Sequence, residues 1–217
     1  MRVLLLLSGG FDSPVAARLL QRDGHEVEAL HFSLEPFTDG RPTEKCIRLA
    51  GLLGLRRLRV VDAGELFADI AREGKRRYYF VLSKVFMLKT AEALARREGF
   101  DALATGESLG QVSSQTLPHL SFLAAQTTLP VVRPLLGFDK SEIVDLARRI
   151  GTFETSAGPE VCDVLGPKHP LVEGRPELLA QELSAVGMDS LVERALARVR
   201  EASLPPETAR PSNTPSA

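Results

Sequence analysis

The feature that most constrains the fold is an apolar run that ends in a pair of glycines. Val3–Leu7 contains only aliphatic side chains, and Ser8-Gly9-Gly10-Phe11-Asp12-Ser13-Pro14 follows it directly. An unbroken aliphatic run of this length is typical of a buried parallel strand, and Ser13 is suited to cap a helix that Pro14 opens. The sequence therefore predicts a strand, a tight glycine turn and the start of a helix.

This corner has the geometry of an anion site. Backbone N–H groups of the turn and of the helix N-terminus converge, and Gly9 and Gly10 carry no β-carbons that keep a phosphate away. The chain contains neither Gly-x-x-x-x-Gly-Lys-Ser/Thr nor Gly-x-Gly-x-x-Gly, which excludes two well-known phosphate loops. The corner predicts a nucleotide pyrophosphate as ligand, and a corner whose glycines serve packing alone is the alternative.

A second polar segment further along the chain also follows directly after a short apolar run. Thr105–Thr116 follows the short apolar run Ala102–Ala104. It is therefore expected at the carboxyl end of a later strand, which is where ligands bind in open α/β sheets.

These segments resemble a known family. Ser-Gly-Gly-x-Asp-Ser resembles the pyrophosphate-binding loop (PP-loop) of the N-type ATP pyrophosphatases, which cleave ATP between its α and β phosphates and adenylate a carbonyl oxygen. Thr105–Thr116 resembles the matching segment of the tRNA 4-thiouridine synthases, the ThiI family. The resemblance covers about residues 2–170, and the further passages that agree in order are His31-Phe32, Pro130–Leu135 with Asp139-Lys140, and Ile150–Phe153 with Pro159–Cys162.

The resemblance implies an ATP-dependent, Mg²⁺-requiring sulfurtransferase that adenylates a tRNA uridine and replaces its C4 oxygen with sulfur. Lys84 departs from the pattern, because the aligned position usually carries arginine; lysine keeps the charge but loses the bidentate fork. The residues that the resemblance assigns to ATP binding are Leu6, Leu7, Ser8, Gly9, Gly10, Asp12, Ser13, His31, Phe32, Lys84, Gly106 and Gln115.

Two residues are expected to act in the chemistry itself. Asp12 is expected to place Mg²⁺ or to orient the phosphates, with capping of the turn as the alternative. Cys162 stands where the family has the cysteine that attacks or resolves the persulfide, and a thiolate is required for that step. Lys168 and His169 are close in sequence and are expected to lower its pKa. A buried, inert thiol is the alternative reading of Cys162.

Composition favours a reducing cytoplasm and raises one question about the substrate. Cys46 and Cys162 are far apart and make no disulfide framework; Cys46 lies at helical spacing with other apolar residues and is expected in the core. No apolar run is long enough to predict a membrane span.

The 27 basic and 28 acidic residues give a net charge of −1, whereas nucleic-acid binders usually carry a basic excess. Local basic clusters are Arg56-Arg57 with Arg59, Lys75-Arg76-Arg77, Arg96-Arg97 and Arg148-Arg149, of which Lys75–Arg77 is favoured for phosphate contacts.

Alternating apolar runs and helical patterns predict an α/β fold. The expected fold class is a doubly wound parallel sheet with helices on both faces, like the adenine nucleotide alpha hydrolases, plus a short C-terminal helical segment. The expected domains are residues 1–172 for the PP-loop domain, 173–203 for a helical appendage and 204–217 for a disordered tail. Among the expected helices are one near Gln111–Ala125 and two in the appendage, at Pro176–Val186 and Asp189–Ala202.

Full-length members of the family also carry an RNA-binding region with a THUMP domain, and some carry a rhodanese domain. Neither fits this chain, so the catalytic domain is expected to stand alone. The expected partners are tRNA with a separate THUMP-type protein, and a persulfide donor such as a cysteine desulfurase or a rhodanese-like protein; a homodimer is left open. The alternatives are an adenylating sulfurtransferase or amide-forming ligase for a small metabolite, and a non-catalytic ATP-sensing subunit.

Overall fold

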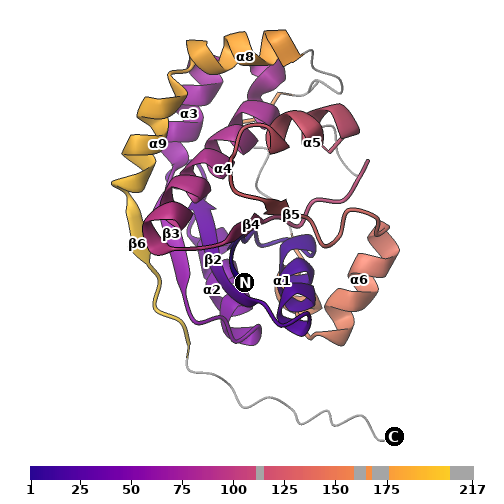
Figure 1. Ribbon diagram of the computed structural model, residues 1–217. Helices are drawn as coiled ribbons and strands as arrows, with labels where there is room; N and C mark the ends of the chain where they lie inside the picture. The colour runs from indigo at the N-terminus through magenta and orange to yellow at the C-terminus, as the bar shows by residue number, and fades with distance from the viewer. Residues whose placement is uncertain (111–114, 159–164, 168–175, 206–217) are drawn as a thin grey trace, which may run out of the picture.

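The computed structural model describes residues 1–110, 115–158, 165–167 and 176–205, and its strands form one six-stranded sheet in the order β5-β4-β1-β2-β3-β6 (Figure 1). All neighbouring strands are parallel except β6, which runs antiparallel to β3. The strands are β1 (Arg2–Leu6), β2 (Glu26–Ser33), β3 (Leu58–Asp62), β4 (Ala102–Ala104), β5 (Val131–Val132) and β6 (Val199–Glu201). The doubly wound α/β fold is confirmed, and the antiparallel edge strand is an addition to it.

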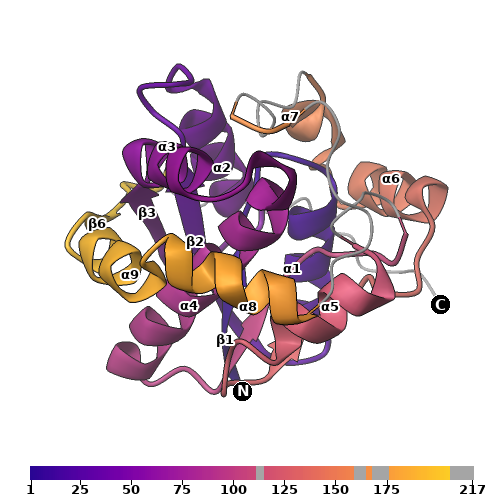
Figure 2. The ribbon, with the colours of Figure 1, turned by 90° about the horizontal axis from the view of Figure 1, so that it is seen from above.

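Helices cover both faces of this sheet (Figure 2). Leu4 of β1 packs into one hydrophobic cluster with α3, α4, α8 and α9, while Val3 and Leu5 pack into a second cluster with α1, α2 and α6. A strand that is buried on both faces needs the unbroken aliphatic run seen in the sequence. The helices are α1 (Asp12–Arg22), α2 (Arg41–Leu52), α3 (Gly64–Glu73), a 3₁₀ turn η1 (Arg76–Tyr78), α4 (Tyr79–Glu98), α5 (Leu117–Ala124), α6 (Lys140–Arg149), α7 (Phe153–Ser156), α8 (Pro176–Ala185) and α9 (Met188–Leu196).

The strand order reverses at β1. The chain winds from β1 to β2 and β3 on one side, and β4 then returns to pair with the other side of β1, with Val3 opposite Ala102. In such sheets the loops after the two central strands leave in opposite directions and open a crevice at their carboxyl ends. The segments that follow β1 and β4 are the two polar motifs of the sequence.

The predicted helix near Gln111–Ala125 starts later than expected where the structure describes it, since Gln115 and Thr116 are not helical and residues 111–114 lie outside the described residues. Within the described residues the helix begins at Leu117, after Thr116 as N-cap, and Pro118 lies in its first turn. Proline has no N–H and its ring clashes with the preceding turn, so it suits a helix start and would have interrupted a helix from residue 111.

The second C-terminal helix is shorter than predicted. The expected helix Asp189–Ala202 ends at Leu196, and Val199–Glu201 pairs with β3 instead, with Val199 opposite Val61. The open edge of β3 offers main-chain hydrogen bonds, which outweigh the helical preference of the sequence. Leu179 of α8 and Leu191 of α9 lie in the same core cluster as α4. The domain boundaries at residues 172 and 203 stay predictions.

Candidate nucleotide-binding site

The loop after β1 is closed by its own serines. The hydroxyl of Ser13 accepts a hydrogen bond from the Ser8 N–H at 2.8 Å and donates one to the Ser8 carbonyl at 3.2 Å. The prediction that Ser13 caps the helix is wrong, because α1 begins at Asp12 and Phe11 is its N-cap, without a side-chain bond. Ser13 holds the loop shut from inside the first turn. In the described part of the chain no group accepts from the N–H groups of Gly9 and Gly10, which leaves them for an anion.

Gly106 joins the two motifs. A β-carbon on Gly106 would lie 2.6 Å from the Ser13 nitrogen and 2.8 Å from the Asp12 carbonyl carbon, so only glycine lets the backbone after β4 lie against the first turn of α1. The segments that sequence places at the ends of two separate strands therefore meet at one point.

A third motif also reaches the loop after β1. The Phe153 ring stacks on Phe11 with centroids 5.2 Å apart, and the Ser156 hydroxyl donates to the Gly10 carbonyl at 3.2 Å. These contacts fasten the start of the segment that continues towards Cys162. Cys162 itself lies outside the described residues, as do Lys168 and His169.

Two lysines from other elements bring positive charge to this loop. Lys140, the first residue of α6, places its Nζ 3.0 Å from Oδ1 of Asp12. Lys45 of α2 packs its stem over Gly9, where a β-carbon would come within 2.7 Å of Lys45 Cδ, and donates from Nζ to the Ser156 carbonyl at 3.3 Å. The fold thus supplies cations that the loop sequence lacks, as a phosphate site requires.

A buried carboxylate gathers further cations beside Gly106. Glu107 accepts from Lys84 Nζ at 2.6 Å, from Arg133 Nε at 2.9 Å and from the Thr105 hydroxyl at 3.1 Å. Burial alone would raise the pKa of Glu107, but Lys84 and Arg133 hold that pKa below its ordinary value. Two cations share one carboxylate here, and Nη2 of Arg133 is buried with no hydrogen-bond partner in the described residues. The cluster therefore carries excess positive charge at the crevice.

His31 is held against the end of β1. Its Nδ1 lies 3.1 Å from the Leu7 carbonyl and its Nε2 lies 3.4 Å from the Thr43 hydroxyl. Burial lowers the pKa of His31 to about 4, so the ring is neutral at pH 7. Because the Leu7 carbonyl can only accept, Nδ1 carries the proton. Phe32 turns to the opposite face and meets Phe67 and Phe86 edge-on in the core.

Cys46 packs next to His31 as an inert thiol. Its Sγ is fully buried, 3.3 Å from His31 Nδ1 and 3.8 Å from the Leu7 carbonyl. Burial raises the pKa of Cys46 to about 12, which keeps the sulfur protonated. The expectation that Cys46 belongs to the core is confirmed.

Gln115 presents a polar atom that has no partner in the described residues. Its backbone carbonyl accepts from the Gly110 N–H at 2.9 Å, whereas its side-chain Oε1 is buried and unbonded. A buried amide oxygen without a hydrogen bond is costly, so a ligand donor is the expected partner.

The structure brings the loop Ser8–Ser13 against Gly106, with Lys84 beside it through Glu107 and His31 at the end of β1, whereas the Phe32 ring packs in the core. The sequence reasoning missed several of the cations around the crevice. Glu107, Arg133 and Lys140 stood within the segments that carried the family resemblance, and no role was assigned to them. Lys45 had no local signal at all, because the packing of α2 against the loop decides its position. Roles in nucleotide binding stay predictions for all of these residues.

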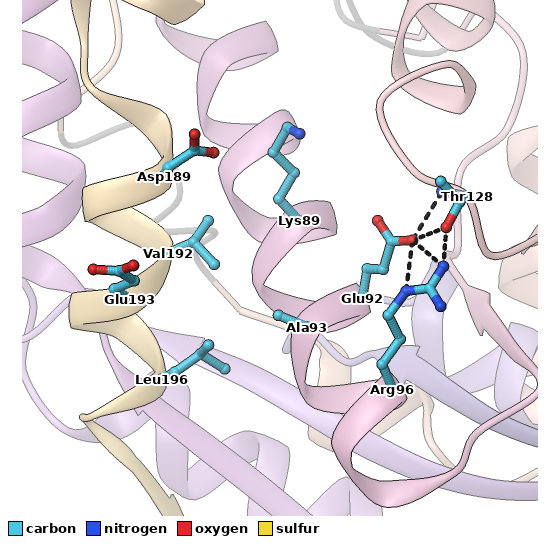
Figure 3. Close-up of a pocket in the computed structure, with 9 residues that line it drawn as sticks. All are labelled: Lys89, Glu92, Ala93, Arg96, Thr128, Asp189, Val192, Glu193 and Leu196. Atoms are coloured by element: carbon cyan, nitrogen blue, oxygen red, sulfur yellow. Dashed lines mark hydrogen bonds and ion pairs between the residues drawn. The ribbon is translucent and has the colours of Figure 1, made fainter.

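A surface groove of about 530 Å³ lies between α4 and α9, away from this crevice (Figure 3). It carries charges of both signs, and Glu92 on its wall accepts from Arg96 and from the Thr128 N–H. Among the helices described, none is both long and apolar enough to cross a bilayer. The described residues also contain no group of three or more His, Cys, Asp and Glu side chains arranged to hold a metal ion.

Comparisons with known proteins point to one family. The family model described as thiamine biosynthesis protein (ThiI) matches residues 1–188. A "Probable tRNA sulfurtransferase" of Thermus thermophilus is 45% identical over 201 residues, which are 90% of this chain and 50% of that protein. One of Alkaliphilus metalliredigens is 41% identical over 201 residues, with 90% and 51% covered.

A solved structure agrees as well. A 4-thiouridine synthetase in complex with RNA and bound ATP matches with a TM-score of 0.86 at 35% identity, covering 93% of this chain and 54% of that one. The chain therefore spans about half the length of the curated relatives it matches.

Proposed function

The chain belongs to the ThiI family, and we propose that it acts as a tRNA sulfurtransferase that binds ATP, adenylates a tRNA uridine and replaces its C4 oxygen with sulfur. The observation that carries the proposal is the contact of Gly106 with the first turn of α1. It joins the loop after β1, whose Gly9 and Gly10 N–H groups have no acceptor among the described residues, to the cation cluster around Glu107.

The first step is adenylation. The uridine O4 attacks the α-phosphorus of ATP, an O–P bond forms, and the bond to the bridging oxygen of the β-phosphate breaks. Negative charge grows on the leaving pyrophosphate, and we assign its stabilisation to the N–H groups of Gly9 and Gly10 and to Lys45 and Lys140, whose Nζ atoms contact Ser156 and Asp12 beside the loop. The residues that we assign to ATP are Leu6, Leu7, Ser8, Gly9, Gly10, Asp12, Ser13, His31, Phe32, Lys84, Gly106 and Gln115.

Asp12 fits the proposed Mg²⁺. Mg²⁺ in nucleotide sites is held by one or two carboxylates together with substrate phosphates, and Asp12 offers one partly exposed carboxylate beside the phosphate loop. When bound, the ion neutralises phosphate charge. Lys140 pairs with the same carboxylate at 3.0 Å.

The second step transfers sulfur. We assign Cys162 as the carrier of a persulfide, whose terminal sulfur bonds to C4 while the C4–O bond breaks and AMP leaves. The product is a disulfide between Cys162 and the new sulfur on C4. Two equivalents of an external thiol reduce it, which releases 4-thiouridine and the Cys162 thiol and leaves the external thiols joined as a disulfide. The fixed contacts of Phe153 and Ser156 at the loop support this assignment, because they start the segment that leads to Cys162 close to the phosphate site.

The partners follow from the same proposal. tRNA is the substrate, a THUMP-type protein or region supplies further RNA contacts, and a cysteine desulfurase or a rhodanese-like protein supplies the persulfide. Self-association into a homodimer and a cytoplasmic location belong to the proposal as well.

The test is ATP–pyrophosphate exchange with Mg²⁺, measured with and without unmodified bulk tRNA. Exchange or AMP formation that depends on tRNA is the expected result. Tight ATP binding without tRNA-dependent turnover, with and without a THUMP-type partner, would contradict it and favour a small-molecule substrate or a nucleotide sensor.

Cysteine variants separate the two steps. Cys162→Ser should abolish 4-thiouridine formation and leave ATP binding and tRNA-dependent ATP–pyrophosphate exchange intact, because adenylation precedes the sulfur step. Cys46→Ser is the matched control, because its thiol is buried and protonated, and it should keep sulfur transfer. Full sulfur transfer by Cys162→Ser would exclude the persulfide at this position.

A further inference from the structure

The fold separates the basic clusters of the sequence into different edges of the sheet. Arg56 and Arg57 precede β3 and so lie at the amino edge, where Arg56 pairs with Glu26 at 3.0 Å. Arg59 is buried and pairs with Glu28 at 2.8 Å, so its charge is neutralised inside the protein and it shares no exposed face with Arg56 and Arg57.

The other end of α4 also points to the amino edge. Arg96 lies in the last turn of α4 and pairs with Glu92 at 3.2 Å, and the carbonyl of nearby Glu98 accepts from Arg2 at the start of β1. A substrate bound at the carboxyl ends of β1 and β4 is on the opposite side. Arg148, at the end of α6, pairs with Asp145 at 2.8 Å.

The remaining cluster, Lys75–Arg77, lies at the start of α4, on the side of the candidate site. Lys84 contacts Glu107 at the crevice and lies about 7.5 Å along the helix axis from Tyr79, where α4 begins, and Arg77 lies in the 3₁₀ turn directly before that start. Arg76 and Arg77 are both exposed, and neither forms an ion pair with any described residue.

The backbone that carries these arginines is fixed. Glu182 of α8, the helix across the top of Figure 1, accepts from the Lys75 N–H at 2.9 Å and from Lys75 Nζ at 2.6 Å. The Arg77 guanidinium lies over the ring of buried Tyr78, 5.6 Å from its centroid. The paired Lys75 thus anchors a turn that presents two unpaired guanidinium groups, a geometry suited to phosphate oxygens.

We propose that Arg76 and Arg77 form an RNA-backbone contact that positions the tRNA as its uridine enters the crevice between β1 and β4. The inference rests on the proposed tRNA substrate and adds the surface that holds it. A phosphodiester backbone fits, because two exposed arginines side by side neutralise neighbouring phosphates without reading sequence. The near-neutral charge of the whole chain is then compatible with RNA binding, since most of the other arginines that the structure describes are paired with carboxylates of the protein.

The experiment compares two double variants that remove the same charge. Arg76→Ala/Arg77→Ala is matched by Arg56→Ala/Arg57→Ala at the amino edge, and Arg76→Lys/Arg77→Lys keeps the charge. Bulk-tRNA dissociation constants are measured between about 50 and 200 mM salt, where phosphate contacts dominate the salt dependence. ATP affinity and thermal unfolding are measured on each variant.

The expected result is a tRNA affinity about tenfold or more lower for Arg76→Ala/Arg77→Ala, with the log–log salt slope reduced by about two and ATP affinity unchanged. The lysine variant should recover most of the affinity, and the Arg56/Arg57 control should match the wild type. Equal tRNA affinity and salt slope in the two alanine variants would overturn the contact while leaving the enzyme proposal standing. Wild-type protein that neither binds tRNA nor turns over with it would overturn both.

Discussion

Two buried ion clusters lie at opposite edges of the same sheet and are balanced differently. At the amino edge, Arg59 is enclosed by Glu28 and Glu98, and Arg2 reaches Glu28 at 3.3 Å. Two cations meet two carboxylates there, and the neighbouring Arg59 and Arg2 hold the pKa of Glu28 below its ordinary value against the effect of burial. All of the charge in this cluster is matched within the protein.

At the carboxyl edge, Glu107 is the one carboxylate among the described residues that pairs with Lys84 and Arg133, and one guanidinium nitrogen of Arg133 has no partner there. The difference teaches how a fold marks its ligand side. A cluster with equal numbers of cations and carboxylates holds strands together. A cluster with one cation in excess can bind an anionic ligand.

The largest expected effect tests the closed cluster. Arg59→Ala leaves Glu28 buried without its main partner, and loss of one partner of a buried pair costs about 3–5 kcal/mol. Urea unfolding measures the free energy. Arg48→Ala, which removes an exposed pair with Glu44, is the control and should cost less than about 0.5 kcal/mol. Similar losses in the two variants would show that the amino-edge cluster is not a special structural element.

The pH dependence of stability should distinguish His31, near the carboxyl edge, from Glu28 at the amino edge. The folded pKa of His31 is about 4, below its value in the unfolded chain, so the unfolded state takes up the proton first as the pH falls. The free energy of unfolding should therefore decrease by about 3 kcal/mol from about pH 6.5 to pH 4. Below that pH the contribution of His31 should not change further. Glu28 has a lowered folded pKa, so its contribution is present above its ordinary pKa and is lost only at more acid pH.

Chemical denaturation across this pH range checks the assignment. His31→Gln should remove the decrease above pH 5, whereas His25→Gln in the turn before β2 should retain it. A wild-type stability that is flat from pH 6.5 to 5 would contradict a buried neutral His31.

The open cluster is tested by Glu107→Gln. Glutamine keeps the shape but offers one acceptor oxygen and two donors, so it cannot hold both Lys84 and Arg133 in place. We expect kcat/KM for ATP to fall about 10–100-fold, which corresponds to about 1.4–2.8 kcal/mol of transition-state stabilisation. Glu92→Gln changes a similarly buried carboxylate outside the crevice and is the control. An equal loss in both variants would show that Glu107 acts through stability alone.

Local signals in the sequence account for the fold's outline. Aliphatic runs, glycine turns and amphipathic helices predicted the central strands and most helices, because each depends on neighbouring residues. The strand–loop–helix around Ser8–Ser13 and its partner segment at Gly106 were predicted for the same reason.

The remaining features depend on contacts between distant segments. Arg59 and Arg133 have the same type of side chain. Their charge environments differ because one pairs with Glu28 and the other with Glu107, and these contacts exist only in the folded sheet. The sequence pattern of Val199–Glu201 also predicts helix, and the segment forms a strand because it pairs with the edge strand β3. Such outcomes are decided by tertiary pairing, which local patterns do not contain.

The smallest expected effect concerns Cys46. It lies beside the carboxyl-edge site, but its side chain is buried like that of Arg59 in the amino-edge cluster. Its Sγ is buried with a pKa of about 12, and a persulfide carrier must form a thiolate. Cys46→Ala should therefore leave tRNA-dependent AMP formation and sulfur transfer unchanged and cost about 1 kcal/mol of stability from the lost packing. Urea unfolding and 4-thiouridine yield measure the two quantities. Loss of sulfur transfer with intact stability would mean that proximity to the site, rather than charge balance and exposure, decides which groups take part in the reaction.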